Sequence, residues 1–248
     1  MPEPRREERP IAAAVIEVRR QRVLLVLSGV FLASMTMLNI LGVTRLVDLS
    51  VPLGAVTIPL VVPIGVLPYP VTFLCTDLIS ELFGRARAGF LVWVGLLCNV
   101  WLFFILWLAG ELPGVGDGNA DAAFFAVRTA ALGSVVGSMI AYLAAQFCDV
   151  HLFHWIKRMT GGRHLWLRNN GSTLVSQFVD TVAVLSIAHY YAGILPVDES
   201  RAALPQLMRL IAAAYVFKAV CAVLDTLPAY WLRARLAAYL HVDPAATH

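Results

Sequence analysis

Charged side chains recur at helical spacing inside long apolar stretches of this sequence. Asp77 and Glu81 lie four residues apart and Lys218 and Asp225 lie seven apart, so each pair falls on one face of a helix. On insertion scales, burying such a charge in hydrocarbon costs about 2.5–3.5 kcal/mol. These side chains therefore need a partner or a purpose, and carboxylates beside a lysine can bind a polar solute.

Two further segments extend this pattern with polar side chains. Thr173, Gln177 and Asp180 form a stripe at helical spacing in an otherwise apolar stretch. Taken singly, each feature has a structural explanation, since Glu81 can extend to the membrane surface and Asp225 can bond a neighbouring helix. Together they predict one shared polar cavity, because a purely structural bundle would be less costly with apolar residues there. The other of these two polar segments lies at residues 128–149. It contributes Arg128, Ser134, Ser138, Tyr142, Gln146 and Asp149.

The residue types of this predicted cavity suit a small polar solute. Carboxylates accept hydrogen bonds from paired N–H donors, whereas lysine and amide side chains such as Asn39 bind carbonyl oxygens. Phe73, Tyr142 and Phe217 offer aromatic faces on which a flat ring can stack. A purine-like base fits these groups, but so do an amino acid and a protonated amine. Residue types alone therefore leave the solute open among these three classes.

The elements that carry these residues are expected to cross a membrane. Of the 248 residues, 59% are hydrophobic and only 14% are charged, whereas a soluble domain is typically about a quarter charged. About 20 apolar residues suffice to cross the hydrocarbon of a bilayer. The sequence thus predicts an all-α integral membrane protein, a bundle of six transmembrane helices. The expected spans are residues 23–43, 57–83, 89–110, 123–148, 172–193 and 205–232.

The second expected span is the least regular. Prolines interrupt residues 51–71, and they are Pro52, Pro59, Pro63, Pro68 and Pro70. Because proline lacks an N–H donor and disrupts helices, we expect this segment to be kinked or partly non-helical. Irregular backbone at membrane depth survives only where protein or a water-filled cavity covers it. The segment is therefore a candidate for lining the cavity.

Charge distribution predicts the orientation of the bundle. Most of the 19 basic residues fall on one side of the expected spans, and by the positive-inside rule this places the N- and C-termini in the cytoplasm. We expect a basic cytoplasmic arm over residues 1–22, a single six-helix transmembrane domain over 23–235 and a cytoplasmic tail over 236–248. Trp155 and Trp166 lie among basic residues and predict an interfacial loop at about 149–170. Gly133 and Gly137 favour close helix packing, either inside the bundle or in a homodimer.

Enzyme classes find little support in the sequence. Asp149, His151 and His154 have metal-ligand types at helical spacing, but no further carboxylate is fixed near them, so a metal-dependent enzyme at the membrane interface is the weaker alternative. No G-x-x-x-x-G-K-[ST] phosphate loop occurs, which argues against ATP hydrolysis by that route. We expect no catalytic residue, metal or cofactor. We also expect no nucleic-acid partner, because the arginines gather at helix ends.

Several blocks of sequence, spread in order over most of the chain, carry a family resemblance. Residues 70–84 read PVTFLCTDLISELFG and residues 171–181 read GSTLVSQFVDT. They resemble the signature of the YhhQ-type vitamin uptake family, the queuosine precursor transporters. Shorter matches lie at residues 128–130, 141–151 and 217–218 and at Pro228.

This resemblance implies a multi-pass protein of the bacterial inner membrane that imports 7-cyano-7-deazaguanine (preQ0), or its aminomethyl relative preQ1, for transfer-RNA modification. A substrate-binding subunit of a larger ATP-driven vitamin transporter is the alternative. Energy coupling stays open among protons, metabolic trapping and such a partner. The resemblance favours Asp77, Gln177, Asp180 and Lys218 as substrate contacts, followed by Glu81 and Arg128. With Phe73 and Asn39 from the residue pattern, the candidate substrate-binding set is Asp77, Gln177, Asp180, Lys218, Glu81, Arg128, Phe73 and Asn39.

Overall fold

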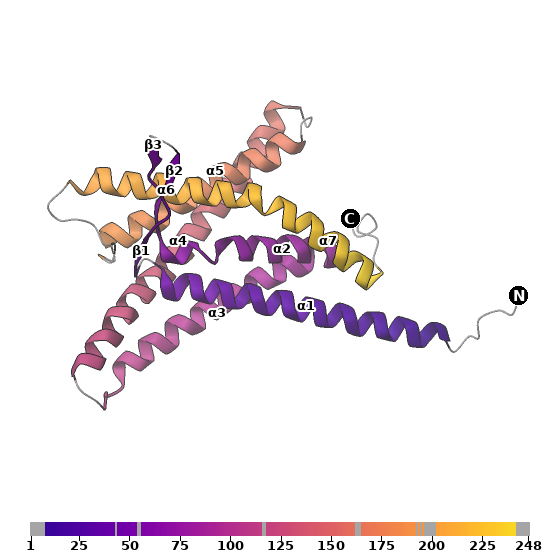
Figure 1. Cartoon of the computed structure of the whole chain (residues 1–248), viewed down its shortest axis with the longest axis horizontal. Coiled ribbons are helices and arrows are strands. Elements are labelled where there is room, and N and C mark those ends of the chain that lie inside the picture. Colours follow the sequence, from indigo (N-terminus) through magenta and orange to yellow (C-terminus); the bar gives the residue numbers. More distant parts are fainter. Residues whose placement is uncertain are drawn as a thin grey trace, which may run out of the picture.

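The computed structural model is a bundle of long helices with a β-hairpin inserted after the first (Figure 1). It describes residues 8–42, 44–53, 56–115, 118–161, 165–191, 193, 195 and 202–241. The helices are α1 (Glu8–Leu41), α2 (Tyr69–Phe83), α3 (Arg85–Glu111), α4 (Gly118–Met159), α5 (Leu165–Ser186), α6 (Ala203–Leu224) and α7 (Thr226–Leu240). The predicted all-α membrane fold is confirmed.

Five stretches of the described chain are long and apolar enough to cross a membrane. They are Ala14–Leu41, Ile64–Phe83, Ala86–Glu111, Ala120–Ala145 and Ala203–Leu240. The last one joins α6 and α7 across a break at Asp225. The expected span at 172–193 corresponds to α5 and the π-helical turn η2 (Ile187–Tyr191), which pack beside α4 but are less apolar. The polar stripe of Gln177 and Asp180 lowers the hydropathy of α5.

The three segments expected outside the bundle are largely helical where the structure describes them. α1 begins at Glu8, so residues 8–22 of the expected arm continue directly into the first span, and α7 continues into the expected tail as far as Leu240. α4 continues to Met159, so the expected interfacial loop is largely helix on both sides of a turn at residues 160–161. Polar side chains do not end a helix by themselves, so these segments can be helical, and their place outside the membrane stays a prediction. Residues 1–7 of the arm, 162–164 of the loop and 242–248 of the tail lie outside the described residues.

The beginning of α1 and the end of α7 lie at the same end of the bundle (Figure 1). The guanidinium of Arg19 lies 4.9 Å from the ring centre of Tyr239. This arrangement agrees with two termini on one side of a membrane. Which side that is stays a prediction from the charge distribution.

The proline-rich region forms a β-hairpin followed by a short helical turn. β1 (Leu46–Asp48) pairs antiparallel with β4 (Val61–Pro63), and β2 (Val51–Leu53) pairs antiparallel with β3 (Val56–Ile58). The Asp48 carboxylate accepts hydrogen bonds from the backbone N–H and the hydroxyl of Ser50, which lower the pKa of Asp48. The 3-10 turn η1 (Ile64–Val66) then leads into α2, with Pro70 in its first turn. The predicted irregularity of this segment is confirmed.

Two glycines form a close crossing between η1 and the end of α1. The backbone N–H of Gly65, in η1, donates to the carbonyl oxygen of Gly42 at 2.9 Å, just after α1. A Cβ on Gly65 would lie 2.6 Å from that oxygen, and a Cβ on Gly42 would lie 2.7 Å from Oγ of Ser134 in α4. Gly42 also has a φ of +43°, which L side chains adopt only with strain. The crossing therefore fixes η1, and with it the start of α2, against α1 and α4.

Apolar clusters surround the space that this crossing borders. Gly137 packs against Ile187, the first residue of η2, so it contributes to packing inside the bundle. One cluster joins α1, α2, α3 and α7 through Phe31, Cys75, Ile79, Leu82, Phe83, Leu91 and Leu240. The other joins α5 and α6 through Leu185, Ala188, Leu195, Leu207, Leu210, Ile211 and Ala214.

Candidate functional site

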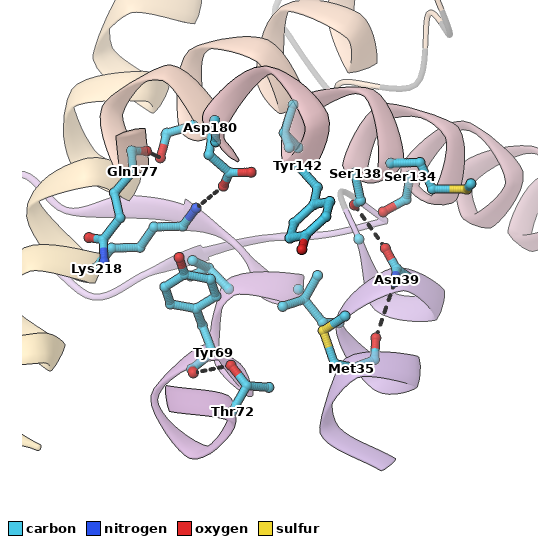
Figure 2. Close-up of a pocket in the computed structure, with 18 of the residues that line it drawn as sticks. Met35, Asn39, Tyr69, Thr72, Ser134, Ser138, Tyr142, Gln177, Asp180 and Lys218 are labelled. Carbon is cyan, nitrogen blue, oxygen red and sulfur yellow. Dashed lines mark hydrogen bonds and ion pairs between the residues drawn. The ribbon is translucent and has the colours of Figure 1, made fainter. Parts of the chain in front are cut away.

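A cavity of about 480 Å³ lies among α1, α2, α3, α4, α5 and α6 (Figure 2). Its volume is typical of sites for small molecules. Most of the wall is apolar, as in such sites generally. Its polar described residues are Asn39, Tyr69, Thr72, Thr76, Asn99, Ser134, Ser138, Tyr142, Ser176, Gln177, Asp180, Thr181 and Lys218.

An ion pair between α5 and α6 forms one side of this cavity. The ammonium of Lys218 donates to Oδ2 of Asp180 at 2.8 Å, and the Lys218 side chain is only 8% exposed. Nζ of Lys218 also lies 4.4 Å from the ring centre of Tyr69, within range of a cation–π interaction. Asp180 and Lys218 are the only charged residues among the described residues that line the cavity. The site thus contains one positive and one negative charge in direct contact.

Gln177 lies one turn before Asp180 on the same helix and has an unsatisfied acceptor. Its side-chain oxygen Oε1 is buried and has no hydrogen-bond partner in the structure. In Figure 2, Gln177, Asp180, Lys218 and Tyr69 gather on one side of the cavity. A buried acceptor without a partner costs about 1–3 kcal/mol. This side of the cavity therefore favours a ligand that brings an N–H donor.

A hydrogen-bond network around the Asn39 amide forms the opposite side of the cavity. Nδ2 of Asn39 donates to Oδ1 of Asn99 at 2.8 Å and to the carbonyl of Met35 at 3.2 Å. Oγ of Ser138 donates to Oδ1 of Asn39 at 2.8 Å. Asn39 is 1% exposed, so these bonds join α1, α3 and α4 in the bundle interior. Because the hydrogen bonds of the Asn39 side chain are already made within the bundle, Asn39 holds α1, α3 and α4 together at this side of the cavity.

Aromatic rings connect the two sides. Tyr69 and Phe73, one turn apart on α2, meet edge to face with ring centres 4.4 Å apart. Both line the cavity, as does Tyr142 of α4, which lies between the two polar groups in Figure 2. The structure thus brings Asn39, Phe73, Gln177, Asp180 and Lys218 of the candidate set to one cavity. Their contact with a solute stays a proposal.

Sequence reasoning missed Tyr69 and Asn99. Tyr69 lies between two prolines, where no helical register could be assigned in advance. Asn99 had a readable signal, because it is the only amide or charged residue of α3 between Arg87 and Glu111. A lone amide at that depth needs a partner on another helix.

Asp77 and Glu81 lie outside the cavity. They line a second pocket of about 350 Å³ between α2 and α7, together with Ser80, Tyr230 and Arg233. Glu81 forms a 3.0 Å ion pair with Arg233, and both side chains are about one third exposed. The helical face of Phe73 does continue through Asp77 to Glu81, but α2 advances about 6 Å from Phe73 to Asp77 and about 12 Å to Glu81, and Thr76 is the last residue of α2 that lines the cavity. The carboxylates therefore lie beyond the end of the cavity.

Arg128 also lies outside the cavity, at the end of α3. Its Nε donates to the carbonyl of Leu106 at 2.8 Å, its Nη2 donates to the carbonyl of Trp107 at 3.1 Å, and Glu111 lies 3.5 Å away. A Cβ on Gly110 would lie 2.2 Å from the guanidinium, so the glycine makes room for it. Both carbonyls lie near the end of α3, so Arg128 ties that end of α3 to α4.

Metal ligands do not cluster in the described part of the chain. No group of three or more His, Cys, Asp or Glu residues there is placed to hold an ion. Nδ1 of His151 lies 2.8 Å from the carbonyl of Phe147 in its own helix. The side chains of Asp149 and His154, and the whole of His164, lie outside what the structure describes.

Comparison with known proteins gives a consistent result. Residues 63–232 match the family described as "Putative vitamin uptake transporter". The chain is 34% identical over 143 residues to the "Probable queuosine precursor transporter" of Bacillus subtilis (strain 168), covering 54% of this chain and 58% of that protein. It is 29% identical over 169 residues to the "Queuosine precursor transporter" of Escherichia coli (strain K12), covering 67% and 70%. The match thus spans less than two thirds of the Bacillus protein, and no solved structure matches.

Proposed function

The chain belongs to the vitamin uptake transporter family, and on that premise we propose that it imports a queuosine precursor, preQ0 or preQ1, across the bacterial inner membrane. Two relatives whose names specify such a precursor support this substrate class. As a transporter it needs a solvent-accessible binding site rather than catalytic residues. The polar cavity among α1–α6 is our candidate for that site.

The observation that carries the proposal is the unpaired oxygen of Gln177 beside the Asp180–Lys218 pair. A deazaguanine is flat, with N–H donors on one part of its edge and a carbonyl acceptor on another. Oε1 of Gln177 and Oδ1 of Asp180 would accept from the donors, while the remaining N–H groups of Lys218 would donate to the carbonyl. The rings of Tyr69 and Phe73 would contact its face.

The other candidate residues receive roles other than direct contact with the solute under this proposal. Asn39 positions the wall opposite the ion pair, and Arg128 stabilises the α3–α4 connection. Asp77 and Glu81 would act at the second pocket, beyond the bound solute. A homodimer and the means of energy coupling are not needed for the binding step and stay predictions from the sequence.

Uptake in cells that cannot make queuosine precursors and lack their own importer tests the proposal. Cells given nanomolar preQ0 would express the native chain, Asp180→Asn or Asp77→Asn, and queuosine would be measured in transfer RNA. We expect restoration by the native chain and loss of at least ~10-fold in apparent affinity with Asp180→Asn, because one paired hydrogen-bond acceptor is removed.

Asp77→Asn is the matched control, since it makes the same chemical change outside the cavity. It should keep the preQ0 concentration for half-maximal uptake within about threefold at equal membrane abundance. Failure of a well-inserted native chain to restore queuosine would contradict the proposed substrate. Equal affinity loss in both variants would contradict the proposed site while leaving the transporter in place.

A further inference from the structure

The charged residues of the cavity also bear on which of the two proposed precursors it binds better. The two proposed precursors differ in charge, since the nitrile preQ0 is neutral at pH 7 and the aminomethyl group of preQ1 is protonated. Resting on the proposed function, we propose that the Asp180–Lys218 pair makes the cavity selective for uncharged deazapurines, with Lys218 as the residue that excludes cations.

The first support is that Lys218 is already paired with the Asp180 carboxylate. A buried ammonium group needs a carboxylate or a comparable partner, because removing its hydration is costly. Asp180 is the only carboxylate among the described residues that line the cavity, and its Oδ2 lies 2.8 Å from Nζ of Lys218. A second ammonium would have to share this carboxylate with the first.

The second support is that Lys218 also occupies an aromatic face. Rings attract cations through the negative charge of their π faces. Nζ of Lys218 lies 4.4 Å from the centre of the Tyr69 ring, and the edge-to-face contact with Phe73 fixes that ring. The lysine thus takes up both the carboxylate and the nearest ring face, and both would otherwise attract a cationic substrate.

The third support is the position of the other carboxylates. Asp77 and Glu81 line the second pocket, and Glu81 is paired there with Arg233. Asp225 lies two turns after Lys218 on the same chain segment and does not line the cavity. An aminomethyl group in the cavity would therefore meet Lys218 without a carboxylate of its own. A neutral nitrile meets no such repulsion.

Competition uptake with the native chain gives a test that needs no variant. Labelled preQ0 would be supplied at its half-saturating concentration at pH 7, with unlabelled preQ0 or preQ1 as competitor. We expect preQ1 to require at least a ~10-fold higher concentration for equal inhibition, because its charge lacks a partner. Equal competition by the two would overturn the selectivity proposal and leave the proposed function intact. Uptake of neither would overturn the proposed function itself.

Two variants then assign the selectivity to the lysine. In Lys218→Met the carboxylate and the ring face become available, so the preQ1-to-preQ0 preference should rise at least ~10-fold over the native ratio. Lys218→Arg keeps the positive charge and should keep the native preference. An unchanged preference in Lys218→Met, in protein that inserts to the native level, would show that another residue excludes cations. If Lys218→Met does not insert, the double variant Asp180→Asn, Lys218→Met removes both charges together, and its preference for preQ0 over preQ1 should be smaller than the native preference. A native-sized preference in that double variant would overturn the role of Lys218.

Discussion

Replacing Gly65 by alanine should destabilise the bundle through a single methyl group. The added Cβ would lie 2.6 Å from the carbonyl oxygen of Gly42 and 2.8 Å from its Cα and N. All three are backbone atoms, so the contact cannot be relieved by rotating a side chain. Either η1 or the end of α1 has to shift, and the 2.9 Å hydrogen bond between the two glycines weakens.

The expected loss combines three effects. Forcing an extra methyl group into a packed site costs about 1–3 kcal/mol. Losing the hydrogen bond costs about 0.5–1.5 kcal/mol. Alanine lowers the conformational entropy of the unfolded chain relative to glycine, which offsets about 0.4–1 kcal/mol of this destabilisation. The net destabilisation of Gly65→Ala is therefore about 0.5–4 kcal/mol, which should lower the unfolding midpoint by up to several degrees.

The buried thiol of Cys75 provides the assay. It is 3% exposed in the apolar cluster of α2, so a thiol-reactive dye should label it only on unfolding. Because Cys98, Cys148 and Cys221 are more accessible, they would first be replaced by serine or alanine. Purified protein in detergent would then be heated with the dye, and the midpoints of native and variant compared.

Gly89→Ala is the matched control. Gly89 lies in α3, and a Cβ there would meet no atom within 4 Å. Alanine in an open helical position should stabilise by about 0.5–1 kcal/mol, since glycine is a poor helix former. If Gly65→Ala raised the midpoint as Gly89→Ala does, the crossing of η1 and α1 would not be tightly packed and the reasoning would be wrong.

Three other substitutions probe contacts around the cavity. Asn39→Leu leaves the amide of Asn99 without its partner and should destabilise by about 0.6–2 kcal/mol in the thermal assay, in the upper range of bonds between membrane helices. Arg128→Lys cannot reproduce two separate bonds from one planar group, so it should destabilise by about 1 kcal/mol and leave preQ0 affinity unchanged. Glu81→Gln breaks a partly exposed ion pair with Arg233, so stability should fall by less than about 1 kcal/mol.

Each of these predictions has a result that would contradict it. The prediction for Asn39→Leu would be contradicted if the variant unfolded at the native midpoint. Ser138→Ala is its milder control, because that change removes only one hydrogen bond to the Asn39 amide. For Arg128→Lys it is a loss of preQ0 affinity at native stability, which would place the arginine in the transport path. For Glu81→Gln it is destabilisation as large as that of Gly65→Ala.

The sequence predicted the membrane class and the main polar wall because both follow from local periodicity. Gln177 and Asp180 are three apart on one helix, so they had to point to similar sides, and Lys218 needed a partner in a low-dielectric interior. Neither inference requires knowledge of how distant segments pack. The inference that Lys218 needs a partner is stronger in a membrane than in water, because an unpaired buried charge costs more there.

Depth along a helix was less predictable than direction around it. Arg128 and Ser138 belong to the same polar series, yet Arg128 bonds carbonyls near the end of α3 and Ser138 bonds Asn39. Asp77 shares a face with Phe73 but lies in a different pocket. Spacing gives the angle at which a side chain leaves its helix, whereas the end of a cavity depends on the neighbouring helices. The β-hairpin was missed because its short apolar strands match the composition of a span.

The length of α4 sets how far the protein extends beyond the bilayer. Its 42 residues correspond to about 63 Å, roughly twice the thickness of the hydrocarbon core. Its apolar span ends at Ala145, so the last 14 residues project about 21 Å further, with Trp155 exposed. For a protein of 27.1 kDa, that projection is a large feature outside the expected membrane span. An antibody fragment raised against it could serve as a fiducial for electron cryomicroscopy without touching the cavity.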